Sequence, residues 1–200
     1  MKLKFIAAFC LVMSFLNAQE VPEKPEDISP LLNGEKIPNA TLLDFQGQDV
    51  NLNKLIKEKP TVLVFYRGGW CPYCNNQLSG LAEIENDILE LGYQIIAVSP
   101  DHYKSLKNTE DKNRIGYSLL SDSDAEFIKA IGIGFKTPEG SKNYIFRKTD
   151  IEASEVLPVP TVMVLNTTGE VLFEYINPNY KQRINEDLLI HALRALKYEL

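Results

Sequence analysis

Two continuous apolar runs dominate the hydrophobic pattern in the middle of the chain. Residues 61–66 read TVLVFY and residues 93–98 read YQIIAV. Uninterrupted β-branched and aromatic runs of this length are typical of strands buried on both faces. Between them, apolar residues recur at helical spacing from Leu78 to Leu91, and Gly92 is placed to end that helix. The pattern predicts a β-α-β unit with a right-handed crossover.

Strands and helices continue to alternate on both sides of this unit. Ser121 or Ser123 is expected to cap a helix that starts near Asp124. The other predicted elements, in chain order, are a short hairpin at 40–45 and 49–52, a helical turn at 53–59, helices at 102–112 and 124–131, a second hairpin at 161–165 and 170–176, and an amphipathic helix at 184–198.

The first segment has the pattern of a secretory signal peptide. Lys2 and Lys4 precede an uncharged apolar run at 5–16, and Ala18 precedes a polar stretch. A run of this length is too short to cross roughly 30 Å of hydrocarbon as a helix. We therefore expect residues 1–18 to be removed and the protein to be exported to the periplasm or cell envelope. Residues 19–35, rich in proline and acids, are expected to form an extended arm.

Composition narrows the functional classes further. A chain of 200 residues with average hydrophobic content forms one domain with its own core. Loss of Lys2 and Lys4 reduces 21 basic residues to 19 against 27 acidic ones, which changes the net charge from -6 to -8. This acidic balance argues against a nucleic-acid partner. The signal peptide also contains Cys10, so the mature chain retains only Cys71 and Cys74.

The remaining cysteines form a Trp70-Cys71-Pro72-Tyr73-Cys74 motif at the strand-to-helix junction of the β-α-β unit. A helix N-terminus carries partial positive charge and stabilises a thiolate placed there. A zinc site would need two further ligands, and the two histidines of the chain lie far from each other in sequence. A structural disulfide would close too small a loop to stabilise the fold much. The context favours a redox-active pair that needs no metal or organic cofactor.

These residues resemble a known family. VFYRGGWCPYC, the later VPT and the closing GEVLFEYINPNYKQR are similar to peroxiredoxin-like members of the alkyl hydroperoxide reductase/thiol-specific antioxidant (AhpC/TSA) family, within the thioredoxin-fold superfamily. The resemblance covers about residues 36–200. It implies an α/β thioredoxin-like fold with a central mixed β-sheet flanked by helices and an N-terminal β-hairpin extension. It also implies a cis proline, here Pro160, facing the cysteines.

The sequence departs from the family pattern at the motif itself. Peroxiredoxins carry Pro-x-x-x-Thr-x-x-Cys, which gives Cys74 the peroxidatic position, places Cys71 where Thr is expected and Arg67 where Pro is expected. Pro160 stands roughly where a distal peroxide-orienting arginine is expected. Arg67 supplies a positive charge that lowers a thiolate pKa, or else forms a surface ion pair with an acid.

Two catalytic hypotheses follow, beside a third in which the chain is a binding domain whose CxxC motif is vestigial. In the first, the protein is a thiol-disulfide oxidoreductase: an exposed Cys71 attacks a protein disulfide, Cys74 resolves the mixed disulfide, and Pro160 and Thr161 hold the substrate chain. Trp70 and Tyr73 form an apolar contact surface for a partner, or else Trp70 packs the loop. In the second, Cys74 attacks a peroxide and Cys71 condenses with the resulting sulfenic acid. Either cycle needs an external thiol or a thioredoxin-type reductant, because an oxidising compartment does not restore the dithiol.

Overall fold

The strand predicted at 61–66 lies inside a seven-stranded mixed sheet. The structure is a computed structural model that describes residues 20–197, so the predicted signal peptide lies outside the described residues. β3 (Thr61–Phe65) pairs in parallel with β4 (Gln94–Ser99) and antiparallel with β8 (Thr161–Leu165). The sheet order is β2-β1-β5-β4-β3-β8-β9, and the other strands are β1 (Thr41–Leu43), β2 (Asp49–Asn51), β5 (Ser118–Ser121) and β9 (Val171–Ile176).

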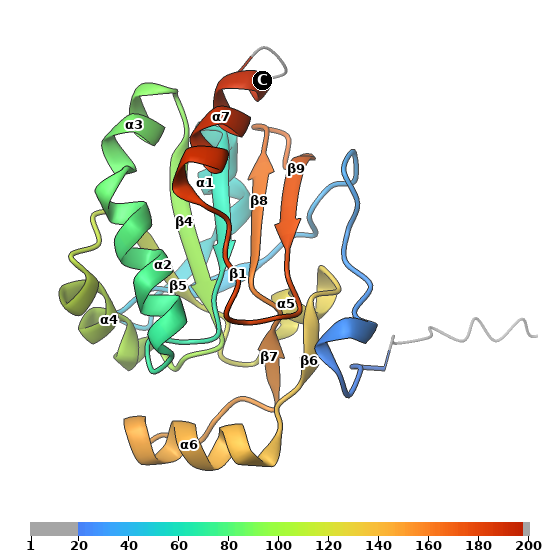
Figure 1. Ribbon diagram of the computed structural model, residues 1–200, viewed down its shortest axis with the longest axis vertical. Helices are drawn as coiled ribbons and strands as arrows, with labels where there is room; N and C mark the ends of the chain where they lie inside the picture. Colours follow the sequence, from blue (N-terminus) through green and yellow to red (C-terminus); the bar gives the residue numbers. More distant parts are fainter. Residues whose placement is uncertain (1–19, 198–200) are drawn as a thin grey trace, which may run out of the picture.

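Successive side chains of β3 point to opposite faces of the sheet, and each face has its own half of the core. Val62 and Val64 face one cluster, whereas Leu63 and Phe65 face the other. The first cluster lies beneath α2 (Pro72–Glu83), α3 (Glu85–Glu90), α4 (Leu106–Asn113) and α7 (Glu186–Leu196); the second lies beneath α1 (Leu52–Glu58) and α5 (Glu126–Ala130). Helices therefore cover both faces of the sheet (Figure 1). The predicted α/β class, with a mixed sheet flanked by helices, is confirmed.

The hairpins and the long helix differ in detail from the pattern-based prediction. Both hairpins form, and the N-terminal one extends the sheet through a Leu43–Ser121 pair. The helix predicted up to Leu91 is interrupted at Ile84, whose ψ of 9° leaves the helical region. Apolar spacing continues across this break, so hydrophobic periodicity does not reveal it. Gly92 follows with a φ of +94°, in the left-handed region that glycine adopts easily.

The predicted N-cap of α5 is wrong. Neither Ser121 nor Ser123 caps this helix; instead, the Asp122 carboxylate accepts from the N–H groups of Phe127 and Ile128 at 3.2 and 2.8 Å. The Asp122 side chain caps the helix although Asp122 is not adjacent to it in sequence, because Ala125 adopts a left-handed conformation just before the helix. The Ser121 hydroxyl donates to the Asp101 carbonyl oxygen instead.

Three short strands and one helix were not predicted from the pattern. β5 has only four residues, and α6 (Glu139–Thr149) buries only Ile145, so neither has a clear hydrophobic period. β6 (Gly134–Lys136) and β7 (Val156–Pro158) form a separate two-stranded ribbon that carries α6 beyond the end of the main sheet (Figure 1). Helix α6 forms one wall of the candidate site.

The N-terminal arm is docked on the domain. After a short 3-10 turn at Pro25–Asp27, the Ser29 and Leu31 N–H groups donate to the carbonyl oxygens of Gly132 and Ile131. A Cβ atom on Gly132 would lie 1.9 Å from the Ser29 oxygen, so the arm packs directly on a position that requires glycine. Among residues 20–197, no helix is long and apolar enough to cross a membrane.

Candidate active site

The loop between β3 and α2 is built around two glycines. Gly68 has a φ of +142°, and a Cβ there would lie 2.1 Å from the Trp70 indole nitrogen and 2.4 Å from a carboxylate oxygen of Asp101. A Cβ on Gly69 would lie 2.0 Å from the Thr109 hydroxyl oxygen. Both positions therefore require a residue without a side chain. The tight loop delivers Cys71 to the N-cap of α2, with Pro72 at the first helical position as predicted.

Cys71 and Cys74 are both reduced and both buried. Their exposed fractions are 2% and 0%, so the prediction of an exposed Cys71 is wrong. The cause is the aromatic surround of the loop, since Trp70 packs against the core cluster that contains both sulfurs. Cys71 is nevertheless the more accessible of the pair, because it borders a cavity and Cys74 does not.

The pKa values of the two cysteines are shifted in opposite directions. Hydrogen bonds from the Cys74 thiol and backbone N–H lower the pKa of Cys71 to about 6, and the charges of Arg67 and Arg183 act in the same direction. Burial raises the pKa of Cys74 well above its ordinary value, and the neighbouring Cys71 thiolate raises it further. The two shifts favour the thiolate on Cys71 and the thiol on Cys74.

Two arginines surround the sulfurs. Arg67 is buried, with its guanidinium 5.2 Å from the Trp70 ring centroid and 4.5 Å from that of Tyr180. No carboxylate pairs with Arg67 in the described part of the chain, so the surface ion-pair alternative is wrong. Arg183 reaches Cys74 from the segment before α7, with its Nη2 3.6 Å from the sulfur. Two cations without acidic partners favour negative charge at this site.

Sequence reasoning missed Arg183. Its position, beyond β9 and 109 residues from Cys74 in the chain, gives no local spacing signal. The available signal was its place at the end of GEVLFEYINPNYKQR, within the stretch most similar to the family. The guanidinium is oriented by the Tyr180 and Gln182 carbonyl oxygens, to which it donates. An arginine beside the redox pair is therefore present, although it comes from another part of the chain than the family pattern implies.

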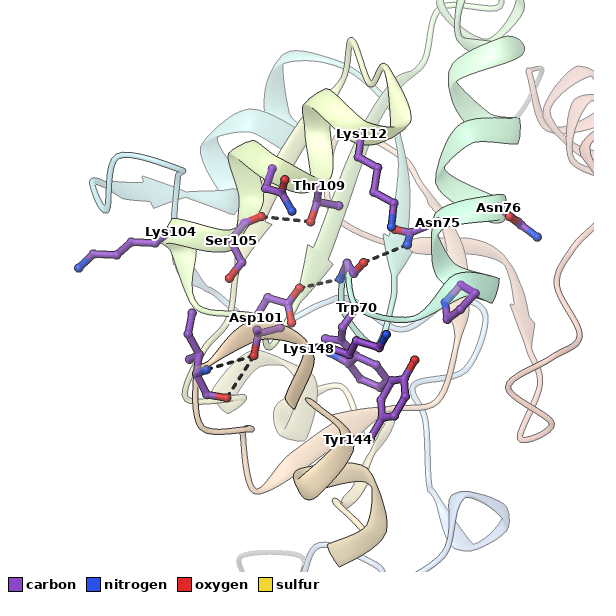
Figure 2. Close-up of a pocket in the computed structure, with 15 residues that line it drawn as sticks. Trp70, Asn75, Asn76, Asp101, Lys104, Ser105, Thr109, Lys112, Tyr144 and Lys148 are labelled. Atoms are coloured by element: carbon purple, nitrogen blue, oxygen red, sulfur yellow. Dashed lines mark hydrogen bonds between the residues drawn. The ribbon is translucent and has the colours of Figure 1, made fainter. Parts of the chain in front are cut away.

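Asp101 is a second residue that the sequence analysis missed. It lies two residues after the end of β4, and the carboxyl ends of the parallel strands β3 and β4 meet at the same edge of the sheet. Its carboxylate accepts from the Gly69 N–H at 2.7 Å and also bonds the Trp70 indole. Figure 2 shows it pointing at the redox loop. Burial raises the pKa of Asp101 to about 6, so this group titrates close to neutral pH.

Cys71 lies at the edge of an open cavity of about 460 Å³. Arg67 and Trp70 form part of its wall, and Tyr73 and Tyr180 meet edge-to-face across it with ring centroids 5.6 Å apart. Trp70, predicted to form a contact surface, and Arg67, predicted to lie near a thiolate, thus both lie beside Cys71. That they position a substrate stays a prediction.

Pro160 and Thr161 lie elsewhere. No peptide bond between residues 20 and 197 is cis, so the predicted cis Pro160 is wrong. A trans bond is the intrinsically favoured form of an X-Pro peptide. The Pro160 carbonyl oxygen accepts from the Asn177 N–H, and Thr161 pairs with Phe65 and Ile176 in the sheet. Neither residue borders the Cys71 cavity, and their role in substrate binding stays a prediction.

No group of three or more His, Cys, Asp or Glu side chains within residues 20–197 is arranged to hold a metal ion. The site brings together two sulfurs, two guanidinium groups and a buried carboxyl group. A CxxC pair at a strand-to-helix junction on this fold defines a thiol oxidoreductase.

Comparison with known proteins specifies the family. The AhpC/TSA family profile matches residues 33–173, and the chain belongs to this family. A putative peroxiredoxin bcp of Haemophilus influenzae is 26% identical over 170 residues, which cover 84% of this chain and 100% of that protein. Peroxiredoxin bcp1 of Schizosaccharomyces pombe is 29% identical over 161 residues, 74% of this chain and 82% of the relative. The protein is a peroxiredoxin-family oxidoreductase.

Solved structures agree on the fold. Reduced Prx3 from Vibrio vulnificus superposes with a TM-score of 0.70 at 20% identity, over 82% of this chain and 99% of that one. Peroxidoxin BcpB from Mycobacterium tuberculosis gives a TM-score of 0.65 at 20% identity, over 82% and 97%. These likenesses establish the architecture around the site.

Proposed function

We propose that the protein is a thiol-dependent peroxidase that reduces hydrogen peroxide or an organic hydroperoxide at Cys71 and Cys74. One observation carries this proposal: Cys71, with its pKa lowered to about 6, borders an open cavity beside the buried and unpaired guanidinium of Arg67. A thiolate is the nucleophile in thiol chemistry, and a nearby cation stabilises the charge that leaves. Family membership supports the same reaction, because the relatives are named peroxiredoxins.

In the first step, the Cys71 thiolate attacks one peroxide oxygen. The sulfur–oxygen bond forms as the oxygen–oxygen bond breaks, sulfur gives up two electrons, and the departing oxygen takes a proton to leave as water or an alcohol. Arg67, which shares the cavity with Cys71, faces the charge that develops on the departing oxygen. Cys71 becomes a sulfenic acid.

In the second step, Cys74 attacks the Cys71 sulfenic acid. The disulfide bond forms and water leaves. The sulfurs lie within one helical turn of each other and already share a hydrogen bond. Arg183, 3.6 Å from Cys74, favours the thiolate of Cys74 in this step. An external thiol then reduces the disulfide and returns both cysteines to thiols.

The family pattern assigns the attacking role to Cys74 instead. The Arg183 contact favours that alternative, whereas full burial and a raised pKa disfavour it. A second candidate function, exchange with protein disulfides, is favoured by the place of Cys71 at the edge of an open cavity. It is disfavoured by Pro160 and Thr161, whose backbone groups are already paired within the fold.

Single-cysteine variants separate these possibilities. We expect Cys74→Ser to accumulate sulfenic acid on Cys71 after one equivalent of peroxide, as detected by dimedone labelling and mass spectrometry. We expect Cys71→Ser to react at least about a hundredfold more slowly. Sulfenic acid on Cys74 at the wild-type rate would transfer the attacking role to Cys74. A wild-type protein that reduces insulin disulfides but does not consume peroxide would establish the second candidate and overturn the peroxidase proposal.

A further inference from the structure

A second cavity adjoins the redox loop on the far side of Trp70. It has a volume of about 640 Å³ and lies between the first turn of α2, the segment that contains α4, and α6. Figure 2 shows Lys112 extending from α4 toward Asn75, and Lys148 lying beside Trp70 and Tyr144. A cavity of this volume accommodates a small organic molecule.

The charge of this cavity is opposite to that of the chain. Lys104, Lys112 and Lys148 line it, and none of them forms an ion pair in the described part of the chain. Asp101 is the one acidic side chain among the lining residues, and its carboxylate is engaged by the Gly69 N–H and the Trp70 indole. On a chain with a net charge of -6, a cavity lined in this way selects anions.

The basic cavity adjoins the cavity that Cys71 borders. Trp70, Pro72 and Tyr144 line both. A molecule that places its acidic groups near Lys112 and Lys148 can therefore extend across this shared rim and reach Cys71. Cys74 borders neither cavity, so the groove leads to one sulfur only.

We propose that this groove binds a small thiol bearing two or more carboxylates, and that this thiol reduces the Cys71–Cys74 disulfide. The proposal rests on the peroxidase cycle above, which leaves a disulfide whose accessible sulfur is Cys71. A reductant must attack that sulfur along the disulfide axis. The groove fits this demand, because its basic part holds the carboxylates while its other end opens on Cys71.

The exchange balances with two molecules of the thiol. The thiolate of the first attacks the Cys71 sulfur, a new sulfur–sulfur bond forms, and Cys74 leaves and takes a proton. The thiolate of the second attacks the ligand sulfur of this mixed disulfide and releases Cys71. The products are one oxidised ligand disulfide and the protein dithiol, so two electrons pass from the ligand to the protein.

Matched thiols of different charge test the proposal. The disulfide is prepared with diamide, which needs no peroxide, and its reduction is followed through the fluorescence of Trp70, the single tryptophan of the chain. Mercaptosuccinate is the dianionic probe and 2-mercaptoethanol the neutral one. Each rate is divided by the rate at which the same thiol reduces a small soluble disulfide, which removes differences in intrinsic reactivity.

The test variant is Lys112→Gln/Lys148→Gln, and the control is Lys54→Gln/Lys57→Gln on α1, where both lysines are exposed and lie away from the groove. We expect the normalised mercaptosuccinate rate to fall about tenfold in the test variant at low salt, while the 2-mercaptoethanol rate changes less than about twofold. The control should match the wild type with both thiols.

A wild-type protein with no preference for the dianion overturns the proposal, as does a preference that survives in the test variant. An equal fall with both thiols also overturns it, because charge recognition would then not be the cause. Failure of the peroxidase function is recognised separately, as absence of peroxide consumption, and leaves this rate comparison unaffected.

Discussion

The two faces of the central sheet are built from the same strands but have different contents. Beneath α1 and α5, Leu63 and Phe65 join an apolar cluster, and the nearby buried carboxyl group of Asp122 accepts two N–H groups. On the opposite face, the cluster beneath α2 contains both cysteines. Two buried guanidinium atoms without a hydrogen-bond partner, the Nε atoms of Arg67 and Arg183, belong to side chains near these cysteines.

This difference indicates that one face of the sheet mainly provides stability and the other mainly provides chemistry. A buried polar group without a partner destabilises a fold, and it persists where it serves a reaction. The α5 face provides stability through its apolar cluster and the hydrogen-bonded carboxylate of Asp122, whereas the α2 face keeps cations available for negative charge on sulfur or oxygen. Substitutions on the α2 face should therefore lower mainly activity, and substitutions on the α5 face should lower mainly stability.

Removal of the reactive sulfur should produce the largest functional effect. We expect Cys71→Ser to lower the rate of peroxide consumption by roughly three orders of magnitude, because no thiolate borders the cavity in its absence. Stability should change by less than about 1 kcal/mol in urea unfolding, since the substitution preserves size. A large loss of stability would show that the α2 face has a structural role as well.

Removal of an aromatic ring on the other face should show the reverse. Phe65 is fully buried and its ring lies 5.6 Å from that of Phe127. We expect Phe65→Ala to lower the free energy of unfolding by about 3–5 kcal/mol, because it leaves a cavity in the core. The activity of the folded fraction should stay within about twofold of wild type. Selective loss of activity at unchanged stability would contradict the division between the faces.

Removal of a cation should shift the reactivity of the pair toward higher pH. We expect Arg183→Met to raise the midpoint of Cys71 alkylation by about one pH unit, because the guanidinium favours the thiolate. Arg194→Met, an exposed position on α7, is the matched control and should leave the midpoint unchanged. Equal alkylation midpoints in both variants would show that Arg183 does not lower the pKa of Cys71.

Substitution of the buried carboxyl group should change the pH dependence of stability. Burial raises the pKa of Asp101 to about 6, so the folded protein binds more protons than the unfolded chain between about pH 4 and 6. The stability contributed by Asp101 is therefore largest below pH 4 and decreases as the pH rises through 6. We expect the unfolding free energy of wild type relative to Asp101→Asn to decrease by up to roughly 3 kcal/mol over this range. A difference in unfolding free energy that does not change with pH would contradict this prediction.

The sequence predicts the parts of this molecule whose signals are local. The runs at 61–66 and 93–98 become β3 and β4, and the glycines, Pro72 and the CxxC motif locate the strand-to-helix junction. Hydrophobic periodicity does not predict α6, because a helix that buries one residue against the domain has no apolar stripe.

The missed site residues have a different cause. Asp101 and Arg183 reach the cysteines through the fold, one from the end of β4 and the other from beyond β9. Their partners are distant in sequence, so no spacing rule connects them to the motif. The predicted exposure of Cys71 failed for a similar reason, because the burial of the sulfur depends on aromatic packing that forms only in the folded domain.

The pH dependence of single-turnover peroxide reduction shows whether Cys71 is the attacking thiolate. Reduced protein is mixed with one equivalent of hydrogen peroxide between pH 4.5 and 9.5, and oxidation is followed through Trp70 fluorescence. We predict a rate that rises with a midpoint near pH 6, the pKa of Cys71, reaches a plateau above neutral pH and disappears in Cys71→Ser. A midpoint near the ordinary thiol value of about 8.5, or full reactivity in Cys71→Ser, would contradict the account.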